Sequence, residues 1–156
     1  MAVRRVVTGD LNGRSSVINE AATLTHDVGQ TEVDILWSCE SSPRVPNDGS
    51  IPDWSGSLPS PGSVLVSTIV IPPNSSAGVK SGNPDFHVTR PGFHRTDSVD
   101  VSMIVEGVCI LELDDGSECV LACGDVVVVN GNMHAWHNRT PQPVRLMTTI
   151  IGATRS

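Results

Sequence analysis

The chain has 156 residues, 38% of them hydrophobic, and a formal net charge of -7 at pH 7. This length suits one domain with a substantial core and is short for two, so we expect a single domain over residues 1–156. The ten Lys and Arg residues are scattered and no apolar run is as long as a membrane span, which argues against nucleic-acid and membrane partners. Because no signal-peptide pattern follows the N-terminal arginines, a cytoplasmic protein is expected.

Short runs rich in Val, Ile and Thr recur between clusters of Gly, Pro, Asn and Asp, and helical periodicity is nearly absent. This pattern is typical of an all-β sandwich or barrel. Asn19–Leu24 could form a single helical turn. Strands are predicted at Arg4–Thr8, Ser16–Asn19, Glu32–Ser38, Ser63–Ile71, Ser98–Glu106, Val108–Asp114, Glu118–Ala122, Asp125–Val129, Met133–Asn138 and Val144–Ile151.

The segment 41–62 is dense in Pro, Ser and Gly, so we expect a long surface loop between two strands. Its length makes it a candidate lid over a site. Trp54 within this loop either anchors the loop to the body of the protein or covers a substrate, and anchoring is the more ordinary role for such a residue. Region 1–62 therefore holds the N-terminal strands and the loop, and the barrel core is expected at 63–151.

Two further features lie in the second half of the chain. The Asp115-Gly116 pair separates two apolar runs and predicts a tight hairpin, because Gly supplies the positive φ that such a turn requires. Cys119 and Cys123 are close in sequence, but no Cys or His at short spacing completes a structural zinc set. Free, buried thiols are therefore the expected state of these two residues.

The chemistry-bearing residues of the chain gather between Gly92 and Asn138. His94, Asp100 and His134 are predicted to lie on successive strands, and extended backbone would place His94 and Asp100 on one face. Two imidazoles and a carboxylate with open coordination positions suit a catalytic divalent metal. The alternative is that both histidines are hydrogen-bonded pocket residues without a metal.

The pattern resembles the cupin superfamily, whose two motifs are G-x5-H-x-H-x3,4-E-x6-G and G-x5-P-x-G-x2-H-x3-N. His94, Thr96, Asp100 and Gly107 have the spacing of the first motif, with Thr in place of one His and Asp in place of Glu. The second motif is matched in spacing by Gly131, His134 and Asn138, whereas Gly124 stands one residue too close and Asn130 lies near the usual Pro. The motifs cover residues 92–138.

The resemblance implies a double-stranded β-helix, a jelly-roll-like barrel of two antiparallel sheets, here with extra N-terminal strands. It implies that His94, Asp100 and His134 are the catalytic residues and the ligands of an iron, manganese, nickel or zinc ion, and that the protein is a homodimer. No organic cofactor is implied. The expected substrate-binding residues on the inward face of the barrel are Thr96, Ser102, Ile104, Trp136 and Asn138.

The remaining histidines have weaker assignments. His87 could reach the mouth of the pocket as an acid or a base, although an ordinary loop histidine is the more common case. His137 is expected to point away from His134 by strand alternation. His26 is expected in a turn.

These residues predict a small-molecule enzyme whose metal polarises a substrate oxygen. The expected chemistry is that of a lyase, dehydratase or isomerase acting on a hydroxylated or polyketide-like metabolite. Two alternatives remain: a non-haem iron dioxygenase, and a metal-free cupin that binds a small ligand without turning it over.

Overall fold

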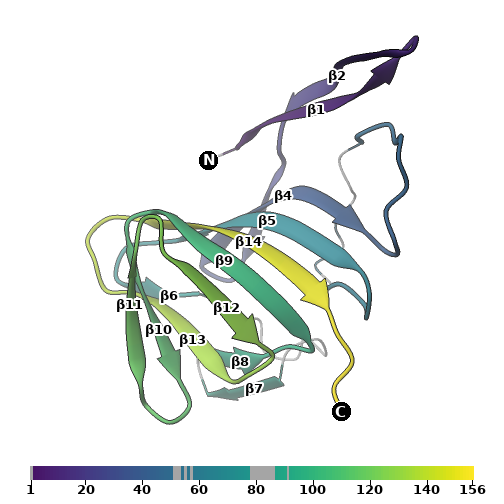
Figure 1. Ribbon diagram of the computed structural model, residues 1–156. Coiled ribbons are helices and arrows are strands. Elements are labelled where there is room, and N and C mark those ends of the chain that lie inside the picture. The colour runs from purple at the N-terminus through teal and green to yellow at the C-terminus, as the bar shows by residue number, and fades with distance from the viewer. Residues whose placement is uncertain (1, 51–53, 55, 57, 78–86, 91) are drawn as a thin grey trace.

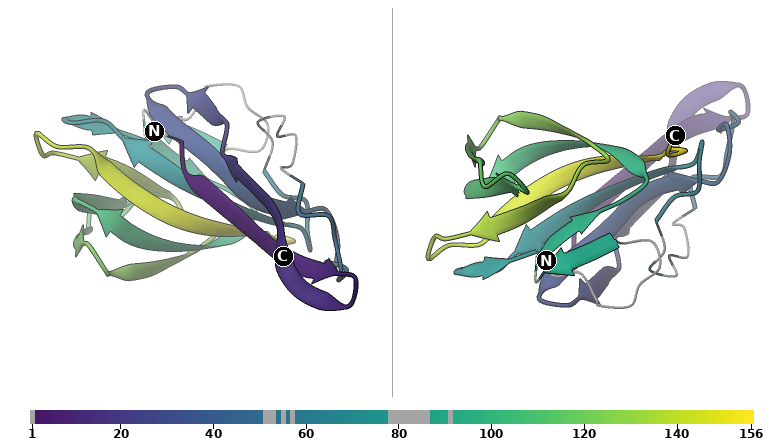
Figure 2. Two further views of the ribbon diagram at one scale, coloured as in Figure 1. Left: turned by 90° about the horizontal axis from the view of Figure 1, so that it is seen from above. Right: turned by 90° about the horizontal axis from the view of Figure 1, so that it is seen from below.

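The computed structural model describes residues 2–50, 54, 56, 58–77, 87–90 and 92–156, and for 87–90 it describes the backbone alone. Every regular element in these residues is a β-strand, and all strands except the two N-terminal ones form two sheets that pack face to face as a barrel (Figure 1, Figure 2). No helix that is long and apolar enough to cross a membrane is found in the described part. The predicted all-β class is confirmed.

One six-stranded sheet has the strand order β12-β9-β14-β5-β4-β3, and all of its neighbouring strands are antiparallel. Its inward faces are apolar in alternation, as along β14, where every second side chain is buried. The strands are β3 (Thr25–Val28), β4 (Thr31–Cys39), β5 (Val64–Ile71), β9 (Ser98–Glu106), β12 (Val126–Asn130) and β14 (Val144–Gly152).

The second sheet has the order β11-β10-β13-β8-β7, and β6 pairs with β13 beside β8. The Asp115-Gly116 hairpin forms as predicted between β10 and β11, where Gly116 has a φ of 84° and its N–H donates to the carbonyl of Leu113. The strands are β6 (Ser75–Ser76), β7 (His87–Arg90), β8 (Phe93–Arg95), β10 (Val108–Leu113), β11 (Glu118–Ala122) and β13 (His134–Asn138).

The space between the sheets holds two apolar clusters. The larger one includes Ile104, Leu111 and Trp136, and the smaller one includes Ile35 and Ile150. Burial of these apolar side chains removes apolar area from water, which is worth about 25 cal/mol per Å² and drives the packing of the two sheets. The gap between the clusters is where the cavity lies.

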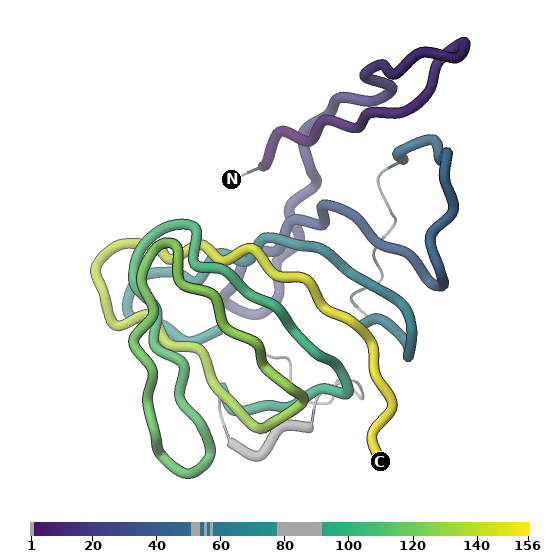
Figure 3. The backbone as a smooth tube through the Cα atoms, viewed as in Figure 1, coloured from purple at the N-terminus to yellow at the C-terminus, as the bar shows by residue number. Residues whose placement is uncertain are grey.

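The N-terminal hairpin of β1 (Arg4–Leu11) and β2 (Arg14–Ala22) projects from the barrel as a separate two-stranded sheet (Figure 1, Figure 3). A lone hairpin is marginally stable in water, so its attachment matters. The buried guanidinium of Arg5 provides it, donating to the carbonyls of Leu36 and Gly49 over 2.5 and 2.7 Å. The single helical turn considered possible at Asn19–Leu24 is not formed, because β2 continues to Ala22.

Other sequence expectations also need correction. The predicted strands are present, but β3, β6, β7 and β8 were not predicted, and His26 lies in β3 and not in a turn. All four of these strands have four residues or fewer, so their sequences offer little alternation to recognise. Cys119 and Cys123 are exposed, contrary to the expectation of buried thiols, and all four cysteines are free.

Candidate active site in the barrel cavity

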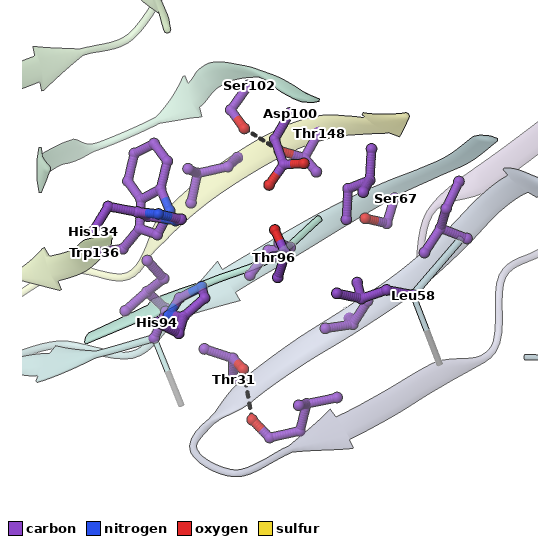
Figure 4. A pocket seen from close by; sticks show the side chains of 18 of the residues that line it. Thr31, Leu58, Ser67, His94, Thr96, Asp100, Ser102, His134, Trp136 and Thr148 are labelled. Atoms are coloured by element: carbon purple, nitrogen blue, oxygen red, sulfur yellow. Dashed lines mark hydrogen bonds between the residues drawn. The ribbon is translucent and has the colours of Figure 1, made fainter. Parts of the chain in front are cut away.

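A cavity of about 120 Å³ lies inside the barrel, and most of its lining is apolar. Its polar side chains come from both sheets, with His94 and His134 on one sheet and Asp100 and Ser102 on the other, and Thr96 lies in the connection between β8 and β9. Figure 4 shows His94 and His134 at one end of this cavity and Leu58 at the other. The three residues predicted to be catalytic therefore line one cavity.

The two histidines are direct cross-strand neighbours. His94 in β8 is the register partner of His134 in β13, and both side chains point into the barrel. Their ring centroids are 4.5 Å apart, and the residues are only 8% and 2% exposed. Trp136, two residues along β13, meets the His134 ring edge-on at 6.1 Å and closes the cavity beside it.

Backbone carbonyls select the tautomer of both imidazoles. Nδ1 of His134 lies 3.0 Å from the carbonyl oxygen of Asn132, and Nδ1 of His94 lies 3.2 Å from that of Gly92. A carbonyl can only accept, so Nδ1 carries the proton in each neutral ring. Nε2 of His134 is then the unprotonated nitrogen, which can act as a base or a ligand.

The Asp100 carboxyl group ends a short hydrogen-bonded chain that runs through the hydroxyl groups of Thr96 and Ser98. The hydroxyl of Ser98 donates to Oδ1 of Asp100 over 2.7 Å, and the hydroxyls of Thr96 and Ser98 are 2.6 Å apart. These contacts hold the carboxyl group from one side. Asp100 comes from β9 in the sheet opposite the histidines, so the cavity separates an acidic side chain from two imidazoles.

Burial governs the charge states of the site. It lowers the pKa of His94 to about 4, helped by the nearby His134, and it also lowers the pKa of His134. Burial raises the pKa of Asp100, against the opposing effects of the Ser98 hydrogen bond and of His134. The site therefore favours neutral imidazoles and makes a protonated carboxyl group more accessible than in water.

Arg155 ties together the two turns that lead into the site. Its Nη2 donates to the carbonyls of Thr96 and Gly131 over 3.1 and 2.9 Å, and its Nε pairs with Asp97 at 2.6 Å. Gly131 has a φ of 64°, which suits glycine, and begins the turn before His134. Arg155 thereby fixes the ends of β8 and β13 relative to one another.

The remaining predicted substrate-binding residues fall into three groups. Thr96, Ser102 and Trp136 line the cavity as predicted, whereas Ile104 and Asn138 do not. Ile104 is packed in the larger apolar cluster, and the Asn138 amide is used to fasten turns through the carbonyls of Ile71, Pro72 and Gln142. The prediction that Ile104 and Asn138 line the pocket is therefore wrong. The side chain of His87 lies outside the described residues.

Sequence reasoning missed Ser67 and Thr148, which also line the cavity. Alternation in the run Val64–Ile71 could have placed Ser67 on the inward face with Leu65, but a single Ser in an apolar strand is a weak signal. Trp54 lines the cavity as well and meets the His26 ring edge-on at 5.3 Å. It is therefore both anchored and part of the cavity wall.

The predicted three-ligand metal site is not formed by the described residues. Among them, no group of three His, Cys, Asp or Glu side chains is arranged to hold a metal ion. His94 and His134 are suited to share a metal, since each has its Nδ1 fixed by a carbonyl, but Asp100 lies across the cavity. A metal held by two imidazoles would need its other ligands from elsewhere.

No family model matches this chain. Phomopsin biosynthesis cluster protein C' of Diaporthe leptostromiformis is 42% identical over 55 residues, covering 33% of this chain and 29% of that protein. The cupin-domain-containing oxidoreductase virC of Hypocrea virens is 36% identical over 61 residues, covering 37% and 31%. The matches thus span about three tenths of these curated relatives.

Solved structures resemble the chain over more of its length. The cupin domain of Cnp3 from Schizosaccharomyces pombe has a TM-score of 0.54 at 12% identity and covers 96% of this chain and 87% of that chain. An RmlC-like cupin from Shewanella frigidimarina has a TM-score of 0.53 at 17% identity and covers 85% and 86%. At such identities these likenesses establish the fold alone.

Proposed function

The chain has the cupin fold, and from the paired histidines in its barrel cavity we propose that it is a small-molecule enzyme that eliminates water from its substrate, or isomerises it, by proton transfer. The observation that carries this proposal is the buried His134 imidazole, whose Nδ1 lies 3.0 Å from the carbonyl oxygen of Asn132 and whose pKa is lowered by burial, which together favour a neutral ring with its proton on Nδ1. Such a ring presents Nε2 as a general base.

The elimination step uses two groups from opposite sheets. Nε2 of His134 takes a proton from the carbon next to a substrate carbonyl, and the electron pair forms the new carbon–carbon double bond. The hydroxyl group on the next carbon leaves with a proton from the carboxyl group of Asp100, and water is released. Burial raises the pKa of Asp100, which favours the protonated form that this role requires.

The cavity wall limits the class of substrate. Aliphatic side chains and Trp136 surround the polar groups, so the wall suits an apolar carbon skeleton with a few oxygen functions. A hydroxylated or polyketide-like metabolite has this character. Phomopsin protein C' is named for a biosynthesis cluster, which supports a role in small-molecule metabolism.

A metal-dependent oxidation is the second candidate, because the relative virC is named an oxidoreductase. Among the described residues, only the two imidazoles are in a suitable arrangement to hold a metal. Iron, manganese, nickel and zinc nevertheless belong in the test, because His94 and His134 together could accept any of them.

A model substrate tests the proposal directly. 3-Hydroxycyclohexanone is small and neutral, and its dehydration to 2-cyclohexenone is followed by ultraviolet absorbance. The wild-type chain is expected to accelerate this reaction, and His134→Gln to reduce kcat/KM at least about a hundredfold, the usual contribution of a positioned general base. Asp100→Asn is expected to reduce it as well.

His137→Gln is the matched control, since His137 is on the same strand but bonds to Ser76 and Glu112 away from the cavity. It should retain the activity. Equal losses in both His variants, or no acceleration by the wild-type chain, would contradict proton transfer by His134. Activity that appears only on adding one of the four metals would instead support metal-assisted chemistry.

A further inference from the structure

A row of three hydroxyl side chains crosses the sheet that faces the histidines. Ser102 in β9 is the register partner of Thr148 in β14, and Thr148 is the register partner of Ser67 in β5. All three residues line the cavity and are at most 4% exposed (Figure 4). We refer to Ser67, Ser102 and Thr148 as the hydroxyl row.

Apolar residues flank the hydroxyl row on one side. Two residues along each strand, on the same face of the sheet, the register partners are Ile104, Leu146 and Ile69. Hydroxyl groups in such surroundings lose their water and need other partners. The row is therefore a polar stripe in an otherwise apolar part of the wall, and a packing role alone would be served better by Val or Ala.

The hydroxyl row contains more O–H donors than its internal hydrogen bond uses. Ser102 and Thr148 bond to one another, which uses one of the three O–H groups. Among the described residues, no acceptor is found for the second O–H of that pair or for the hydroxyl of Ser67. An ordered water can fill this place until a ligand oxygen displaces it. Two O–H donors thus remain for one ligand oxygen.

The charge of the cavity decides which kind of oxygen fits. None of the described lining residues is Lys or Arg, and Asp100 lies on the strand that carries Ser102. A carboxylate or phosphate would find no cation here and would meet the Asp100 side chain. A neutral oxygen, such as that of a ketone or an alcohol, suits two hydroxyl donors.

We propose that the hydroxyl row is the subsite for the carbonyl oxygen of the substrate, which is a neutral ketone or aldehyde with a mostly apolar skeleton. This inference rests on the proposed function. When His134 removes the neighbouring proton, negative charge develops on that oxygen, and the O–H groups of Ser67 and Thr148 donate to it. The row thereby adds catalytic residues to the imidazole and carboxyl groups.

A pair of probes isolates the oxygen contact. Cyclohexanone and methylenecyclohexane have nearly the same shape, but cyclohexanone carries a carbonyl oxygen where methylenecyclohexane carries a CH2 group. Their Kd values are measured from the intrinsic tryptophan fluorescence, because Trp54 and Trp136 both line the cavity. Thr148→Val and Ser67→Ala are each expected to weaken cyclohexanone binding about fivefold, the usual value of one neutral hydrogen bond, and to change methylenecyclohexane binding by less than about twofold.

Thr149→Val is the matched control for Thr148→Val, because Thr149 is the next residue of β14, is absent from the cavity wall and carries the same substitution. It should leave both affinities unchanged. The subsite is contradicted if Thr148→Val weakens both probes equally, if it weakens neither, or if cyclohexanone fails to bind the wild-type chain. The subsite is tested by binding and the proposed function by turnover, so their failures are distinguishable. If the wild-type chain turns over 3-hydroxycyclohexanone but Thr148→Val binds cyclohexanone as tightly as the wild-type chain does, the subsite is wrong and the proposed function stands.

Discussion

At the scale of single residues, the two buried imidazoles have a thermodynamic consequence that can be measured without any substrate. Burial and the nearby His134 lower the pKa of His94 to about 4. In the unfolded chain a histidine has a pKa of about 6.5. The unfolded state therefore binds a proton between these values that the folded state does not, and acid favours unfolding.

The free energy of unfolding is expected to fall as the pH is lowered from about 6.5 to about 4, with His94 contributing roughly 3 kcal/mol. Denaturant titrations across this range measure the effect. His94→Gln should flatten the profile, and His137→Gln serves as the histidine control. Identical profiles for His94→Gln and the wild-type chain would show that His94 is not buried as a neutral ring.

The sequence was informative for residues that belong to one strand and uninformative for residues whose role depends on register. His94, Asp100 and His134 follow from spacing and alternation, and the structure brings all three to one cavity. Ser67 and Thr148 could not be predicted as a pair, because only the pairing of β5 with β14 places them opposite one another. Asn138 shows the converse, since it shares a face with His134 yet lies beyond the cavity.

At the scale of elements, long strands with clear alternation were predicted within a few residues, as β14 was. The short strands β6, β7 and β8 were not, because their pairing with neighbours defines them more than their own composition does. The position of β8 matters most for the site. Without it, the sequence predicts that His94 shares a face with Asp100, whereas the structure places them on opposite sheets.

The outward face of the sheet containing β9, β12 and β14 is apolar and exposed. Val128, Met103 and Met147 are 58%, 45% and 42% exposed, and the register brings Val126, Met103 and Met147 into one row. Exposed apolar patches of this kind often mark interfaces. The homodimer expected from the cupin resemblance remains a prediction, and we propose this face as its interface.

Val128→Glu is expected to shift the protein towards monomers, because it places a carboxylate within the proposed interface, where burial would leave it without water. Light scattering during size-exclusion chromatography measures the mass. Val120→Glu on β11 is the matched control, since Val120 is 69% exposed on the other sheet. A wild-type monomer, or equal behaviour of the two variants, would rule this interface out.

At the scale of the whole molecule, the barrel and the catalytic proposal follow from one arrangement. Two antiparallel sheets enclose a cavity with imidazoles on one wall and a carboxyl group and hydroxyls on the other. The spacing of the two motifs predicts this barrel from the sequence, because the barrel depends on turns that many sequences share. The metal was predicted from the same motif, but the number of ligands depends on side-chain positions that spacing does not determine.

The proposed chemistry requires His134 to be a neutral ring with its proton on Nδ1 and with Nε2 available in the cavity. Long-range proton–nitrogen correlation spectra of the imidazole rings at pH 7, with His134→Gln for assignment, measure this protonation state. The expected spectrum is that of a neutral His134 ring with a protonated Nδ1 and an unprotonated Nε2. An imidazolium signal, or a proton on Nε2 of the neutral ring, would contradict it.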